Sequence, residues 1–237
     1  MKILSIVGSP RVNGNTHFLA QTFCEGARSA GWESEEVILN QKKIHGCIHC
    51  DKCLETGVCA IEDDQAELIA KMRAADGYVL STPVYCFSVT AQMKAFLDRS
   101  WSMCRPTWIT GVEGKPVFFI VGAAGPPRQD PNYVLLHHLT FETMFRIAKA
   151  VKLVQRAPVK TAIDPMADFD ATSDTLKLLY QVSGILGMEP VGFIAAESLG
   201  HDRDMIRNHR QEEVQNAAAA GAKFAFVGNM MKAKAFL

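Results

Sequence analysis

The stretch Lys2-Ile-Leu-Ser-Ile-Val7, followed by Gly8-Ser-Pro-Arg-Val-Asn-Gly-Asn-Thr16, decides the fold that the sequence predicts. Its first half is a short, β-branched apolar run, which is typical of a buried strand in a parallel sheet. Its second half is dense in turn residues, and apolar residues at helical spacing follow it over 17–31. A strand, a polar loop and a helix in this order favour phosphate binding, because loop N–H groups and the positive end of the helix dipole both attract an anion.

The loop matches neither of the two best-known phosphate motifs. A P-loop would need glycine in place of Asn13 and lysine in place of Gly14, and the dinucleotide pattern Gly-x-Gly-x-x-Gly is absent. The loop instead offers many hydrogen-bond donors and one fixed charge, which suits a monophosphate bound without magnesium, as in FMN. Its candidate ligands are Ser9, Arg11, Asn13, Asn15 and Thr16. The alternative is a tight turn in which Asn15 is a helix N-cap.

Four further segments, three of them apolar and the one at 32–39 with an acidic first half, predict a five-stranded parallel sheet of the doubly wound α/β class. They cover 32–39, 77–82, 115–121 and 191–196, and helical periodicity covers 65–75, 89–101, 172–187 and 210–227. The acidic residues at 62–64 stand where negative charge caps a helix N-terminus. We therefore expect one domain over 1–227, with an insertion at about 126–170 and a C-terminal tail at 228–237.

Two more loops follow predicted strands and complete a candidate pocket. The first begins with Pro83 and carries an aromatic pair, while the second is a run of small residues that allows close backbone approach. Because the carboxyl ends of parallel strands meet at one edge of a sheet, we expect these loops to converge with 9–16. The candidate residues for a flat ring are Pro83, Val84, Tyr85, Cys86, Phe87, Ser88, Gly122, Ala123 and Gly125.

Four of the seven cysteines lie close together, at Cys47, Cys50, Cys53 and Cys59. A loop this compact can direct all four sulfur atoms at one iron–sulfur cluster. The alternatives are a zinc site, which more usually takes its cysteines from two separated pairs, and four reduced thiols without a metal.

Composition and charge describe an ordinary globular chain. Its 237 residues are 48% hydrophobic, and 25 basic residues balance 25 acidic ones. A neutral chain gives no electrostatic reason to expect nucleic acid or an anionic membrane as a partner. No apolar stretch reaches the roughly eighteen residues of a spanning helix, and the first residues are typical of a strand rather than a signal peptide. Because unbridged cysteines fit a reducing compartment, we expect a cytoplasmic location.

On these motifs, the chain resembles flavodoxin-fold proteins of the NAD(P)H-dependent FMN reductase-like family, and within it the iron–sulfur flavoproteins of anaerobic archaea and bacteria. The resemblance rests on Gly8-Ser-Pro-Arg11, Gly14-Asn-Thr16, the cysteine loop at 45–60, Asp63-Asp64, Pro83-Val-Tyr85 and Lys94-Ala-Phe-Leu-Asp-Arg99. It implies that the first loop binds the FMN phosphate and that 83–88 and 122–125 surround the flavin ring. It also implies a [4Fe–4S] cluster on Cys47, Cys50, Cys53 and Cys59.

Three functions follow from this resemblance as alternatives. The first is an FMN-dependent oxidoreductase that passes electrons between a [4Fe–4S] cluster, FMN and an external donor or acceptor. Its redox partner would be a small molecule or a ferredoxin-like protein, with NAD(P)H as a further candidate donor. The second is an NAD(P)H-dependent FMN, quinone or nitro-compound reductase without a cluster, and the third is a redox-sensing binding protein. No catalytic acid or base is expected, since the flavin carries the redox chemistry, and we expect a homodimer or homotetramer.

Overall fold

The computed structural model describes residues 1–124, 171–197, 199–200 and 202–234. Within them, five parallel strands form one sheet in the order β2-β1-β3-β4-β5. The strands are β1 (Lys2–Val7), β2 (Glu33–Ile38), β3 (Gly77–Pro83), β4 (Pro116–Gly122) and β5 (Glu189–Ala196). This is the flavodoxin-like order of a doubly wound sheet, so the predicted fold class is confirmed.

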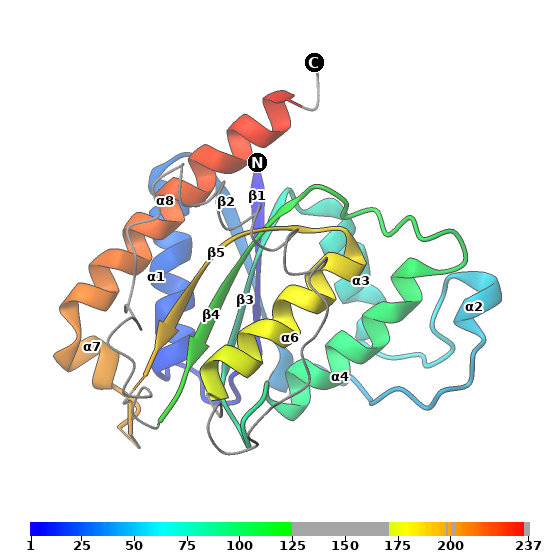
Figure 1. The fold of residues 1–237 in the computed structure, drawn as a ribbon, viewed down its shortest axis with the longest axis horizontal. Helices are drawn as coiled ribbons and strands as arrows, with labels where there is room; N and C mark the ends of the chain where they lie inside the picture. Colours follow the sequence, from blue (N-terminus) through cyan, green and yellow to red (C-terminus); the bar gives the residue numbers. More distant parts are fainter. Residues whose placement is uncertain (125–170, 198, 201, 235–237) are drawn as a thin grey trace, which may run out of the picture.

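Helices cover both faces of the sheet (Figure 1). One face carries α1 (Asn15–Ser29), α7 (Met205–His209) and α8 (Gln211–Lys234), and the other carries α3 (Gln65–Ala74), α4 (Ala91–Arg99) and α6 (Ala171–Leu186). The short elements are η1 (Leu39–Gln41), α2 (Cys53–Thr56) and η2 (Ser100–Cys104). Among the described helices, none combines the length and the apolar character needed to cross a membrane.

The central strands supply the core on both sides, because their side chains alternate between the two faces. In β1, Leu4 and Ile6 pack against α3, α4 and α6, whereas Ile3 packs against α1 and α8. The edge strand β2 is exposed at Glu33, as its acidic first half predicts. Burial on both faces explains why the inner strands are nearly continuous apolar runs.

Helices α1 and α8 cross with their backbones almost in contact. A Cβ atom on Gly26 would lie 1.9 Å from the carbonyl oxygen of Ala218, and one on Gly221 would lie 1.8 Å from that of Phe23. These distances leave room for hydrogen alone, so the crossing depends on glycine at both positions.

Several helix boundaries differ from those predicted, and for two of them the contacts show why. Helix α8 continues to Lys234 rather than ending at 227, and contacts with the rest of the domain explain this: Trp32 Nε1 donates to Asn229 Oδ1 (3.1 Å) and Lys232 pairs with Asp76 (3.0 Å). Helix α4 begins at 91 rather than 89 because the Thr90 side chain caps it. Gly125, the insertion at 126–170 and the final residues 235–237 of the predicted tail lie outside the described residues.

Candidate functional site

The loops after β1, β3 and β4 meet at the carboxyl edge of the sheet. The Gly8 N–H donates to the Ser81 carbonyl (2.7 Å), and the Thr90 hydroxyl donates to the Gly8 carbonyl (2.7 Å). The Val84 N–H donates to the Gly122 carbonyl (2.8 Å). The predicted convergence of three strand-end loops is therefore present in the fold.

The first helix begins inside this edge without a side-chain cap. Its N-cap residue is Gly14, which disproves the alternative of an N-cap at Asn15. The first-turn residues Thr16 and His17 are 4% and 1% exposed. A helix N-terminus leaves backbone N–H groups that need acceptors, and one that is buried and uncapped is suited to an anion such as phosphate.

The small residue at the end of β4 makes room for this helix. A Cβ atom on Gly122 would lie 2.6 Å from Thr16 Oγ1. We expected the small residues at 122–125 to admit a ligand, and here Gly122 also admits the phosphate-loop threonine. The next residue, Ala123, is paired on both sides of its backbone, with its N–H donating to Ala196 and its carbonyl accepting from Leu199.

The polar side chains of the first loop are not all available to a ligand. Ser9 Oγ accepts the Arg11 N–H (3.2 Å), while the Arg11 side chain is exposed. The Asn15 amide donates to the Asp202 carbonyl (2.7 Å) and accepts the Ile206 N–H (3.0 Å). Asn15 therefore fastens the start of α7 to the loop, and its assignment to phosphate stays a prediction that this contact does not favour.

A second arginine lies beside the loop and was missed by the sequence analysis. The Arg203 guanidinium donates to the Val12 carbonyl (3.0 Å), and Arg207 lies over the Phe18 ring at 4.6 Å. Arg203 thus places a fixed positive charge at the backbone carbonyl of the residue that follows Arg11. No local pattern could have found it, because only the packing of α7 on α1 brings together residues 191 positions apart.

The predicted ring-binding loop is a strained two-residue turn. The N–H groups of Tyr85 and Ser88 donate to each other's carbonyl groups (2.9 and 3.1 Å), with Cys86 and Phe87 between them at φ values of 46° and 63°. These are the angles of a type I′ turn, which normally contains glycine or asparagine. Tyr85 and Phe87 are 43% and 59% exposed. Backbone strain of this kind collects at binding sites, so the exposed aromatic pair remains the best candidate to contact a flavin ring.

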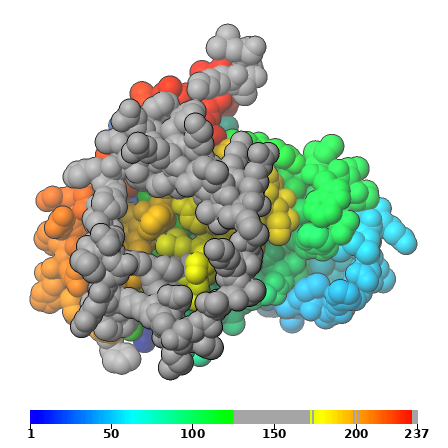
Figure 2. Space-filling model, viewed as in Figure 1, coloured from blue at the N-terminus to red at the C-terminus, as the bar shows by residue number. Residues whose placement is uncertain are grey.

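The cysteine loop lies on the outer side of α3 and α4, away from the tips of the strands (Figure 1). In the space-filling view it forms the right-hand edge of the molecule, next to the segment that follows η2 (Figure 2). Cys47 and Cys50 are exposed, and Cys53 and Cys59 are half-buried. The loop is therefore a surface feature of the described chain.

A buried arginine on α4 joins the two ends of this loop. The side chain of Arg99 is 1% exposed and donates to the carboxylate of Asp63, which is 3% exposed. It also donates to the His45 carbonyl (3.2 Å), the Ile61 carbonyl (3.2 Å) and the Cys59 sulfur (3.4 Å). Arg99 ends the motif Lys94-Ala-Phe-Leu-Asp-Arg99, but the sequence gives it no role, since its partners lie far away in sequence.

Asp63 has a second role besides the predicted one. Its Oδ1 accepts the Gln65 N–H (3.1 Å) at the start of α3, whereas the N-cap residue, Asp64, makes no side-chain cap hydrogen bond, so the predicted capping falls to Asp63. Its Oδ2 accepts the His45 N–H (2.9 Å) and pairs with Arg99. Burial opposes ionisation of this carboxyl, but the hydrogen bonds from Arg99 and the two amides outweigh it and hold the pKa of Asp63 below its usual range.

The donor set of the cysteine loop fits an iron–sulfur cluster in its chemistry, but the arrangement of the side chains does not form a metal site. The His49 N–H donates to the Cys47 sulfur (3.4 Å), as Arg99 does to Cys59, and hydrogen bonds to sulfur are what tune such clusters. Across the described residues, however, no three His, Cys, Asp or Glu side chains are placed to hold a metal ion.

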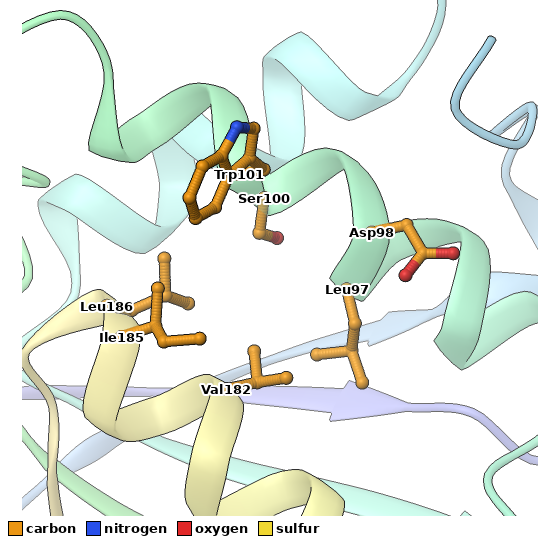
Figure 3. A pocket seen from close by; sticks show the side chains of 7 residues that line it. All are labelled: Leu97, Asp98, Ser100, Trp101, Val182, Ile185 and Leu186. Carbon is orange, nitrogen blue, oxygen red and sulfur yellow. The ribbon is translucent and has the colours of Figure 1, made fainter. Parts of the chain in front are cut away.

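A cavity of about 240 Å³ lies between α6 and the end of α4 (Figure 3). Its lining residues are Leu97, Asp98, Ser100, Trp101, Val182, Ile185 and Leu186. None of them belongs to the three strand-end loops. The cavity is therefore separate from the candidate flavin site.

The sheet order and the loop after β1 together define a flavodoxin-like α/β protein. Residues 1–170 match the family described as NADPH-dependent FMN reductase, so the chain belongs to that family. The predicted family is thereby confirmed. Among solved structures, the NAD(P)H:quinone oxidoreductase from Methanothermobacter marburgensis superposes with a TM-score of 0.60 over 94% of this chain and 95% of that chain. At 14% identity, that likeness concerns the fold alone.

The sequence relatives carry two kinds of name. An iron–sulfur flavoprotein of Methanocaldococcus jannaschii is 43% identical over 100 residues, which are 42% of this chain and 52% of that protein. One from Archaeoglobus fulgidus is 34% identical over 134 residues, which are 56% and 60% of the two chains. An FMN-dependent NADH:quinone oxidoreductase of Cupriavidus necator is 32% identical over 99 residues, 38% and 48% of the chains. The chain thus matches 52% and 60% of the length of these two iron–sulfur flavoproteins.

Proposed function

We propose that the chain binds FMN at the carboxyl edge of its sheet and passes electrons between FMN, a [4Fe–4S] cluster and an external donor or acceptor. The observation that carries the flavin half is the buried N-terminus of α1, which has no side-chain cap and lies where three strand-end loops meet. Family membership supports the choice of FMN over other phosphate compounds.

FMN, when bound, supplies the redox chemistry, since its ring takes electrons singly or in pairs. The task of the chain is to hold and orient it. The start of α1 receives the phosphate, and the guanidinium groups of Arg11 and Arg203 add positive charge to that end. Tyr85 and Phe87, exposed on the strained turn, contact the ring.

The cluster half of the proposal rests on the cysteine loop. Cys47, Cys50, Cys53 and Cys59 would hold the cluster, and it would supply one-electron transfer. The hydrogen bonds to two of these sulfur atoms and the names of the iron–sulfur relatives support this assignment. We further propose a cytoplasmic homodimer or homotetramer that exchanges electrons with a ferredoxin-like protein or a small molecule, with NAD(P)H as a candidate donor.

Anaerobic purification followed by visible spectroscopy and iron and sulfide analysis tests both halves. We expect flavin absorbance and one four-iron cluster per chain. Cys53→Ser should lose iron and sulfide and keep FMN, whereas Cys104→Ser, a buried cysteine outside the loop, should keep both. Absence of flavin would refute the FMN site, and flavin without iron would refute the cluster alone.

A second candidate is an NAD(P)H-dependent quinone or nitro-compound reductase that works without a cluster. The observation in its favour is that the described side chains form no metal-holding group. It predicts that metal-free protein oxidises NAD(P)H rapidly when a quinone is present, and that Cys53→Ser leaves this rate unchanged. A rate that depends on iron content would exclude it.

A further inference from the structure

The first turn of α1 contains a histidine that is held at both ring nitrogens. The His17 side chain is 2% exposed. Its Nδ1 accepts the backbone N–H of Asn13 (2.8 Å), and its Nε2 lies 2.8 Å from Glu36 Oε2 on β2. Because a backbone N–H can only donate, Nδ1 is the acceptor, and Nε2 carries the hydrogen that is donated to Glu36.

The residue that His17 holds has a backbone conformation uncommon for a side chain other than glycine. Asn13 has a φ of 60°, in the left-handed region. It is followed by Gly14, whose N–H bonds back to the Arg11 carbonyl (3.2 Å) and whose carbonyl accepts from Phe18 in α1. The turn at Asn13 thus sets the direction in which the chain enters α1, and with it the direction of the uncapped N–H groups.

We infer that His17, backed by Glu36, is a positioning residue that holds the 11–14 turn in the shape needed to bind the phosphate group of FMN. This inference rests on the proposed FMN site. The hydrogen bonds of His17 reach the phosphate loop and β2, and neither reaches the 83–88 turn. His17 should therefore strengthen binding of the phosphate and leave binding of the ring unaffected, so that it favours FMN over riboflavin.

A matched pair of variants tests this. Leucine and asparagine have nearly the same shape, but in His17→Asn the side-chain oxygen can replace Nδ1 as acceptor, while His17→Leu has none. Flavin fluorescence quenching on the apoprotein would give Kd for FMN and for riboflavin. We expect His17→Leu to raise the Kd for FMN roughly tenfold, the effect of about one lost hydrogen bond, and to change the Kd for riboflavin less than twofold. His17→Asn should bind FMN within about threefold of the unmutated chain, since the acceptor is retained.

Two further variants keep the inference testable if the buried leucine impairs folding. Glu36→Leu changes a side chain that is 31% exposed on the edge strand. It should shift the ratio of the Kd values for FMN and riboflavin in the same direction as His17→Leu. Glu36→Gln keeps an oxygen that can accept from His17 Nε2, so its ratio of Kd values for FMN and riboflavin should stay within about threefold of that of the unmutated chain.

The possible failures are distinguishable. If the unmutated chain binds no FMN, the proposed function is wrong and the inference is wrong with it. If the unmutated chain binds FMN but His17→Leu and Glu36→Leu leave the FMN-to-riboflavin ratio unchanged, or weaken both flavins equally, His17 is a structural residue of the helix and the positioning role alone is refuted.

Discussion

Replacing Gly26 by alanine should destabilise this protein, although the same change stabilises most helices. In a helix interior, alanine is favoured over glycine by about 1 kcal/mol. Here the new Cβ atom would lie 1.9 Å from the Ala218 carbonyl oxygen, where real Cβ atoms keep at least 3.0 Å. Helices α1 and α8 would have to separate by about 1 Å along a crossing where backbone meets backbone and no side-chain rotation can relieve the contact.

Overpacking costs typically 1–3 kcal/mol, and a clash with backbone belongs at the upper end. After the gain of about 1 kcal/mol from helix propensity is subtracted, we expect a net loss of about 2 kcal/mol in unfolding free energy. Urea unfolding followed by circular dichroism would measure it. Gly221→Ala should behave alike, since its Cβ atom would lie 1.8 Å from the Phe23 carbonyl. Gly46→Ala is the matched control, because a Cβ atom there meets nothing within 4 Å. An unfolding midpoint for Gly26→Ala equal to or above that of the unmutated chain would refute the reasoning.

Three further changes have expected outcomes. Arg99→Met leaves the Asp63 carboxylate buried without its partner, so unfolding free energy should fall by about 3–5 kcal/mol, and hydrogen exchange should rise across 45–61; unchanged exchange would contradict the role of Arg99 in holding the loop. Burial opposes ionisation of Asp76, but hydrogen bonds from the Lys2 amide and from Lys232 lower its pKa. The stability that the ionised carboxylate adds to the folded state is therefore complete above about pH 5 and is lost as pH falls through the folded-state pKa. The urea midpoints of the unmutated chain and Asp76→Asn should therefore differ at pH 7 and converge toward pH 3, and a constant difference would exclude this linkage. Gly122→Ala should raise the Kd for FMN at least tenfold and the Kd for riboflavin less, because the new methyl group displaces Thr16 of the phosphate loop. Equal losses of affinity for both flavins would instead indicate general misfolding.

The sheet was predictable because its inner strands are buried on both faces. Residues 2–7 have no polar face to satisfy, so a bare apolar run identifies the strand without any knowledge of its neighbours. The loops followed from the same logic, since the ends of parallel strands must meet at one edge. The position of Gly122 opposite Thr16 is a consequence of that geometry.

The connections around the two candidate sites were not predictable, because they join residues distant in sequence. Arg99 reaches His45 across 54 positions, and the Asn15 amide bonds to a carbonyl 187 positions away. Spacing along the chain carries no trace of such contacts. For the same reason, the spacing of the four cysteines suggested a shared metal, while the described arrangement of their side chains depends on how Arg99 and Asp63 fix the ends of the loop.

The turn at Cys86 and Phe87 lowers local stability while it presents the Phe87 ring for binding. An engineer who wanted a more robust protein would write Asn-Gly there, since those residues adopt positive φ angles readily. That exchange would relax the backbone and delete the large ring of Phe87 from the edge of the candidate flavin site. The natural sequence keeps Cys86 and Phe87 in a strained conformation. A redesign guided by stability alone would therefore favour, at this turn, a more stable protein that binds the proposed flavin less tightly.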